Sequence, residues 1–286
     1  MNRIFAKSIL LALLAPLAAH AQTAEIEVTI LPPPPAEQDL VAASSMPRGM
    51  ERAELLDGWQ TEDGARIAAI RIALDEGWKT YWRSPGEAGI PPQFNFAESQ
   101  NVTSVQVRWP RPVVFEQNGM RTVGYRDEVV LPIEITPIDP SQPVALSADL
   151  DFGICHDVCV PVSVEVTADL QGPGLLNEPT IMGALSSQPQ ITTLPVLCEI
   201  EPISDGVRVT ARIPLAADAP EPLPVFELAS APVWVSEAVS HREGDMLVSM
   251  AEFVPDEAAP FALDPQDLRI TLLDGASAFE IDGCED

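Results

Sequence analysis

The sequence predicts an all-β protein with two sandwich domains joined by a linker that contains a short helix. Apolar residues recur at every second position on both sides of a segment rich in glycine and proline, and this period is typical of strands. Helical periods are few, and turn residues separate the short apolar runs. Many short strands of this kind indicate sandwiches rather than layers of helix and strand. The length of 286 residues suits one large or two ordinary domains.

Five runs show the alternation most clearly. They lie at 70–74, 105–109, 129–135, 207–213 and 268–272. The last run precedes Asp274-Gly275, a pair typical of tight turns. We expect each run to form a strand.

The N-terminus has the features of an export signal. Arg3 and Lys7 precede an apolar run over 9–17, and small residues lead to Ala21. We expect a cleaved signal peptide over 1–21 and a proline-rich leader over 22–50. No later stretch approaches the roughly 20 apolar residues that spanning a bilayer requires, so we expect no stable membrane insertion.

The chain is strongly acidic, with a formal net charge of −27. Such a charge argues against nucleic acid and anionic membranes as partners. Solubility alone is the simplest interpretation of this acidity.

Glycine and proline mark the predicted domain boundaries. The segment 171–195 has glycine and proline at its start, proline at its end and one helical candidate over 179–187. We therefore predict a first sandwich over 51–170, a linker over 171–195 and a second sandwich over 196–286.

The segment 144–170 predicts a hairpin that carries two cysteines. Its apolar residues fall on even positions, whereas Cys155 and Cys159 are odd and are expected to point away from the core. Four extended residues cover about 13 Å, but bridged cysteines need Cα atoms within roughly 4.4–6.8 Å. A bridge therefore requires the chain to reverse at 156–158.

A Cys155–Cys159 bridge is a weak structural staple, because a five-residue loop contributes only about 2 kcal/mol in the chain-entropy model. An exposed bridge in a small loop is a better candidate for thiol-disulfide exchange in an oxidising compartment. A hairpin clip without chemistry remains the alternative. His156 is either a solvated turn residue or a group that favours a thiolate on its neighbour.

Cys198 and Cys284 are predicted to form a structural disulfide. Their bridge would close a loop of over 80 residues, which contributes about 4.5 kcal/mol in the same model. A second exchange pair is the alternative, although the two cysteines lie far apart in sequence.

Three segments carry a resemblance to a known family. The runs WPRPVVFEQNGMRTVGYRDEVVLPIEIT (109–136) and DFGICHDVCVPVSVEV (151–166) resemble the N-terminal periplasmic domain of the DsbD thiol:disulfide interchange proteins. The run GWKTYWRSPGEAGIPPQF (77–94) and the two-domain layout resemble the related ScsB proteins, which are associated with copper tolerance. The resemblance implies immunoglobulin-like sandwiches and the periplasm of a Gram-negative bacterium.

The resemblance also implies roles for particular residues. Cys159 would exchange with partners, and Cys155 would be the resolving thiol. The family's cap over the pair would fall near Asn118, Gly119 and Met120, with Met120 in place of the usual aromatic shield. The residues expected to flank the pair are Tyr81, Tyr125 and His156, with Trp78 and Trp82 as further aromatic candidates.

The implied activity is that of a thiol:disulfide oxidoreductase without a cofactor. The sequence contains no multi-span membrane segment and no Cys-x-x-Cys thioredoxin module. We therefore expect a separate membrane electron-transfer protein as reductant and thioredoxin-like periplasmic proteins as acceptors.

Two other functions stay open. Cys-x-x-x-Cys also resembles the Cu(I) motif of Sco-type proteins, whose thiolates suit copper, but here a strand pattern follows where those proteins have a helix. A non-catalytic interaction module is the second alternative. No metal site is predicted, since only His156 joins the cysteine pair and a structural zinc site needs four ligands.

Overall fold

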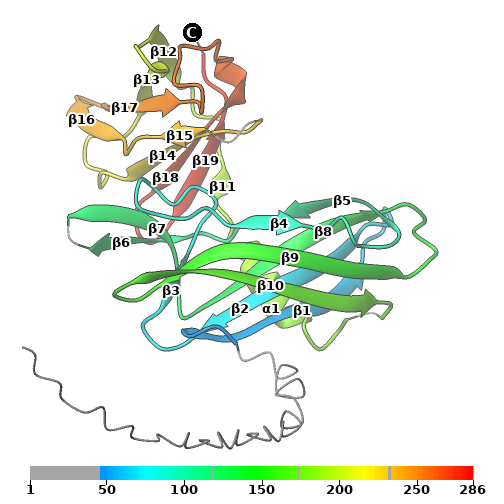
Figure 1. Cartoon of the computed structure of the whole chain (residues 1–286). Coiled ribbons are helices and arrows are strands. Elements are labelled where there is room, and N and C mark those ends of the chain that lie inside the picture. Colours follow the sequence, from blue (N-terminus) through cyan, green and yellow to red (C-terminus); the bar gives the residue numbers. More distant parts are fainter. Residues whose placement is uncertain (1–45, 118, 173, 231–232, 286) are drawn as a thin grey trace, which may run out of the picture. The chain divides into compact units, whose positions relative to one another are not determined.

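The computed structural model describes residues 46–117, 119–172, 174–230 and 233–285 (Figure 1). The expected signal peptide and nearly all of the expected leader lie outside the described residues. Within the described part, strands predominate and α1 (Glu178–Ser186) is the one α-helix, so the predicted all-β class is confirmed. No helix in this part is long and apolar enough to cross a bilayer.

The first sandwich consists of two antiparallel sheets. One has the order β1-β2-β8-β5, and the other has the order β10-β9-β3-β7-β6, with β4 paired to β9. The strands are β1 (Met50–Gln60), β2 (Arg66–Leu74), β3 (Lys79–Tyr81), β4 (Gln93–Asn95), β5 (Val102–Val107), β6 (Val113–Gln117), β7 (Met120–Arg126), β8 (Glu128–Pro137), β9 (Val144–Cys155) and β10 (Cys159–Leu170).

Strands β9 and β10 form the predicted cysteine hairpin. The register pairs every residue without a shift, from Val144 with Leu170 to Cys155 with Cys159. Even-numbered side chains such as Phe152 and Ile154 are buried in the first core, as the alternation predicts. The odd-numbered side chains therefore lie on the other face of this sheet.

Helix α1 lies in the segment predicted as a linker. It packs on the first sandwich through Ile181, which is fully buried against Leu56, Ile67 and Ala69. Pro179 stands in its first turn, where a missing N–H costs no helical hydrogen bond. This segment is thus partly an element of the first sandwich's surface.

The second sandwich also consists of two sheets. Their orders are β11-β19-β18-β14 and β12-β13-β17-β15, with β16 paired to β17. The elements are β11 (Gln190–Ile191), β12 (Leu197–Pro202), β13 (Val207–Pro214), β14 (Leu223–Leu228), β15 (Trp234–Val235), β16 (Val239–Glu243), β17 (Met246–Val254), the 3-10 turn η2 (Pro265–Asp267), β18 (Leu268–Leu273) and β19 (Ala278–Asp282). Strand β11 already lies within the predicted linker and pairs in parallel with β19.

A disulfide joins the two ends of the second sandwich. Cys198 on β12 and Cys284 just after β19 are bridged, with their Cα atoms 5.9 Å apart, and both are buried. A backbone hydrogen bond lies next to the bridge: the N–H of Cys198 donates to the Glu285 carbonyl at 2.7 Å. The predicted pairing of these cysteines is therefore present.

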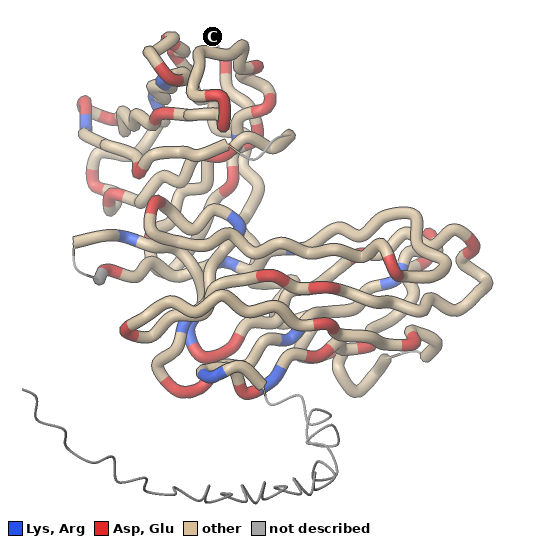
Figure 2. Tube along the Cα trace, viewed as in Figure 1, with Lys and Arg blue, Asp and Glu red and all other residues tan. Residues whose placement is uncertain are grey.

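Charged side chains are distributed over both sandwiches. Figure 2 shows acidic residues along strands and loops of both, with fewer basic residues between them. Because the chain has 43 acidic and 16 basic residues, individual cations stand out as local exceptions to a negative field.

Candidate functional site

The site is built around the tip of the β9–β10 hairpin. Cys155 ends β9, Cys159 begins β10, and the chain reverses at 156–158 as predicted. The two cysteines form a disulfide, with their Cα atoms 4.1 Å apart. Val158 at the tip is 71% exposed.

The two sulfur-bearing residues differ in accessibility. Both lie on the face away from the core, as the alternation predicts, and Cys159 is exposed. Cys155, however, is only 1% exposed, so the expectation that both are open to solvent is wrong for this residue. Other side chains cover that face of β9, which a period of two along one strand does not reveal.

Tyr81 is the group in closest polar contact with the pair. Its hydroxyl lies 2.8 Å from Cys155 Sγ and 3.2 Å from Cys159 Sγ. Since neither bridged sulfur carries a hydrogen, the tyrosine hydroxyl is the donor in both contacts. Burial raises the pKa of Tyr81, which keeps this donor protonated.

Gly153 makes room for this arrangement. A Cβ at Gly153 would lie 3.1 Å from Cε2 of Tyr81 and 2.9 Å from Cδ1 of Ile90. Such distances are shorter than ordinary carbon contacts. The Tyr81 ring and the Ile90 side chain therefore lie directly over β9, two residues before Cys155.

Replacing Tyr81 with phenylalanine is expected to slow alkylation of the reduced pair at neutral pH by about fivefold, the equivalent of one net hydrogen bond of about 1 kcal/mol. The ring would still cover β9, but the donor that stabilises a thiolate would be lost. Iodoacetamide labelling followed by mass spectrometry measures the rate. Tyr125→Phe is the control, because its hydroxyl donates to the Pro110 carbonyl at 2.8 Å; equal slowing in both variants would contradict the assignment.

Lys79 lies on the strand next to Cys155, and Arg126 lies one strand further along the same sheet. Lys79 pairs with Cys155 on one side and with Arg126 on the other, and paired side chains share a face. Both cations contact the ring of Phe115, each 5.1 Å from its centroid. Burial, and then the charge of Arg126, lowers the pKa of Lys79. Positive charge at this position favours a thiolate in an otherwise acidic protein.

Sequence reasoning missed Lys79, Arg126 and Phe115. Phe115 is buried on β6, where its ring contacts both cations. The sequence contained one signal that could have identified Lys79. Lys79 and Tyr81 stand on either side of Thr80 in a strand, so their side chains lie on the same face.

His156 and Trp78 lie at the hairpin turn. His156 Nδ1 is 3.0 Å from the Asp157 carboxylate, and its side chain is 48% exposed. The rings of His156 and Trp78 have centroids 6.0 Å apart. His156 therefore flanks the tip as predicted in position, whereas an effect on the thiols stays a prediction.

The remaining predicted neighbours lie elsewhere. Tyr125 pairs with Thr80 and faces the core. The register of β3 and β7 therefore corrects the prediction that Tyr125 flanks the cysteine pair. Met120 begins β7 six residues before Arg126, which is about 20 Å along a strand, and it is 53% exposed. Trp82 is fully buried in the first core. Asn118 lies outside the described residues, and a capping role for Gly119 and Met120 stays a prediction.

No group of three or more His, Cys, Asp or Glu residues in the described part is arranged to hold a metal ion. The Cu(I) alternative, which needs only the two thiolates of the reduced pair, stays a prediction. Titration of the reduced chain with Cu(I) would test it.

Comparisons with known proteins find one matching family model and a structure of similar fold. Residues 52–171 match the family model described as thiol:disulfide interchange protein DsbD, N-terminal. The structure is similar to the N-terminal periplasmic domain of ScsB from Proteus mirabilis, with a TM-score of 0.59, 24% identity, and coverage of 82% of this chain and 91% of that one. No curated protein matches the sequence. The first sandwich thus has the immunoglobulin-like fold of that family.

Proposed function

We propose that this chain, whose residues 52–171 match the N-terminal domain family of the DsbD thiol:disulfide interchange proteins, relays electrons in the periplasm by thiol-disulfide exchange. Cys155 and Cys159 carry the electrons. The donor is a dithiol of a separate membrane protein, and the acceptors are thioredoxin-like proteins.

The observation that carries this proposal is the unequal accessibility of the two cysteines. Cys159 is exposed beside Val158 at a protruding tip, whereas Cys155 is buried under Tyr81. An exchange pair needs one sulfur that a partner reaches and a second that stays within reach of the first. A disulfide that only held the hairpin together would not require a hydroxyl group in contact with both sulfurs.

The exchange proceeds in two steps. The Cys159 thiolate of the reduced chain attacks one sulfur of the partner's disulfide, forming a mixed disulfide and releasing the other partner sulfur as a thiolate that takes a proton. The Cys155 thiolate then attacks Cys159 Sγ, which closes the Cys155–Cys159 bridge and frees the second partner thiol. Two electrons pass to the partner, and the membrane dithiol restores the reduced pair by the reverse sequence.

Tyr81 acts on both steps through the same hydroxyl. In the reduced chain it donates to whichever sulfur carries the negative charge, since it lies within 3.2 Å of both sulfurs in the bridged form. Lys79 and Arg126 add positive charge on the same face. This arrangement stabilises the leaving and attacking thiolates without a metal or an organic cofactor.

The proposal is tested by mixing the reduced chain with an oxidised thioredoxin and locating disulfides by mass spectrometry. We expect the Cys155–Cys159 bridge to form as the thioredoxin becomes reduced. A Cys155→Ser chain is expected to stop at a mixed disulfide on Cys159, since the resolving thiol is absent.

The Cys198–Cys284 bridge serves as the internal control, because it is buried in the second sandwich and should stay oxidised throughout. Failure of the Cys155→Ser chain to form any mixed disulfide, with thioredoxin or with a detergent-solubilised membrane fraction, would count against the relay. A pair that stays bridged under mild reductant would favour the silent clip.

A further inference from the structure

The loop between β3 and β4 connects two groups that cover the cysteine strand. It leaves β3 at Tyr81, whose hydroxyl contacts both sulfurs, and it returns through Ile90. Both side chains pack on Gly153 of β9. The position of this loop therefore determines how deeply Cys155 is covered.

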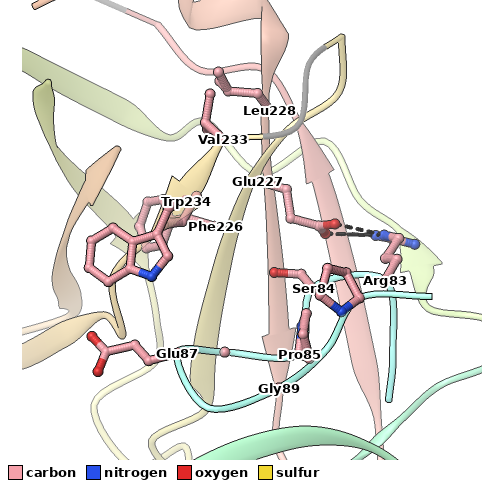
Figure 3. A pocket seen from close by; sticks show the side chains of 13 residues that line it. Arg83, Ser84, Pro85, Glu87, Gly89, Phe226, Glu227, Leu228, Val233 and Trp234 are labelled. Atoms are coloured by element: carbon pink, nitrogen blue, oxygen red, sulfur yellow. Dashed lines mark hydrogen bonds and ion pairs between the residues drawn. The ribbon is translucent and has the colours of Figure 1, made fainter. Parts of the chain in front are cut away.

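The second sandwich holds this loop through Arg83. Arg83 Nε donates to Glu227 Oε1 at 2.9 Å, and Nη2 donates to Glu227 Oε2 at 3.0 Å and to Glu280 Oε2 at 2.5 Å (Figure 3 shows the Glu227 contact). Glu227 lies on β14 and Glu280 on β19. The three side chains are only 12–17% exposed, so these charge-assisted bonds are weakly screened by water.

A second polar contact holds the middle of the loop. The Glu87 carboxylate accepts a hydrogen bond from the backbone N–H of Glu237 at 3.2 Å, and Glu237 also forms an ion pair with Arg121 on β7. A cavity of about 260 Å³ lies beside the loop, and its lining includes Glu87 from the loop and Trp234 from the second sandwich (Figure 3). Discrete polar contacts, rather than continuous packing, thus hold this part of the loop against the second sandwich.

Arg83 is two residues from Tyr81, which is about 7 Å of extended chain. The intervening Trp82 is fully buried, and the Arg83 guanidinium lies 4.3 Å from the centroid of its ring. This short backbone link is the route by which a displacement at Arg83 would reach Tyr81. The same displacement would lift Tyr81 and Ile90 from Gly153 and so give reagents access to Cys155.

We propose that the second sandwich is a positioning module for the cysteine pair, in which Glu227 and Glu280 fix Arg83 and thereby hold Tyr81 and Ile90 over Cys155. The inference rests on the proposed exchange function and assigns a role to residues 196–286 within it. Arg83, Glu227 and Glu280 are positioning residues, since none of them contacts a sulfur.

The test compares alkylation of the buried thiol with and without this contact. In a Cys159→Ser chain, Cys155 is the only free thiol. Adding Glu227→Gln keeps the side-chain shape but removes the bidentate carboxylate. We expect iodoacetamide to modify Cys155 about tenfold faster in the double variant, because the covering loop opens more often. Glu280→Gln, which leaves the Glu227 contact in place, is expected to give a smaller acceleration.

The matched control is Glu252→Gln in the same Cys159→Ser chain. Glu252 binds Arg208 at 2.7 Å in the second sandwich, in an ion pair of the same type at a more exposed position. This variant should leave the alkylation rate unchanged. Intact Cys198–Cys284 bridges and unchanged circular dichroism would establish that each variant is folded.

Equal rates in the Glu227→Gln, Glu280→Gln and control chains would overturn the inference. Slower alkylation after either substitution would do the same. If Glu227→Gln prevents folding, the Glu280→Gln and Arg83→Lys variants still test the inference. Lysine at position 83 keeps the positive charge but lacks the planar guanidinium, so Arg83→Lys should accelerate alkylation. The readout needs no partner protein, so it can fail while exchange with thioredoxin succeeds, and the reverse also holds.

Discussion

Cys159 in a Cys155→Ser chain is expected to react with iodoacetamide about one hundred times faster than Cys155 in a Cys159→Ser chain, the factor that a local opening of about 3 kcal/mol imposes. Cys159 is exposed at the tip, whereas Cys155 is 1% exposed beneath the Tyr81 ring. A reagent reaches Cys155 only after the covering side chains move. This order of reactivity would support the proposal that Cys159 is the sulfur that meets partners.

Both rates are measured at neutral pH by mass spectrometry of the reduced chains. Unfolding each variant in urea provides the control, because the two thiols should then react at similar rates. Equal rates in the folded chains would show that burial does not separate the two cysteines, and the assignment of attacking and resolving roles would lose its basis.

Replacing Cys198 and Cys284 together with serine is expected to lower the free energy of unfolding by about 4.5 kcal/mol in the chain-entropy model. The bridge spans 86 positions and joins the first long strand of the second sandwich to the segment after its last. Losing it frees the unfolded chain more than losing a five-residue loop does. Urea denaturation of the oxidised proteins measures the difference.

The comparison is the chain with Cys155→Ser and Cys159→Ser, which should lose only about 2 kcal/mol in the same model. The contrast between the two double variants separates a staple from a reactive pair. A larger loss from removal of the hairpin bridge would reverse these assignments and favour a structural clip at Cys155 and Cys159.

The hairpin could be predicted from sequence because its pattern is local. The period of two along 144–170 determines which face each residue occupies, and the structure confirms the reversal at 156–158 and the burial of Phe152 and Ile154. Four of the alternating runs lie within β2, β8, β13 and β18, whereas the run 105–109 begins in β5 and extends two residues beyond it. The alternation marks a strand wherever its partner lies, because it depends only on which face of that strand is buried.

The cover over Cys155 could not be predicted in the same way, because it comes from residues distant in sequence. Tyr81 reaches the sulfurs only because β3 lies between β9 and β7, and that strand order has no local signal. Tyr125 was misplaced for the same reason, since a shift of one residue relative to β3 decides its face. The contact of Arg83 with Glu227 depends on the arrangement of two sandwiches and was equally invisible.

The unbroken ladder from Val144 and Leu170 to the tip has one more consequence. It holds the backbones of Cys155 and Cys159 side by side whether or not their sulfurs are joined, so the second thiol remains at a high effective concentration relative to the first. Under the proposed exchange, a mixed disulfide at Cys159 would therefore be short-lived, and release of the partner protein would be fast. The regular pairing of β9 and β10 would thus limit the time that the chain stays covalently bound to a partner.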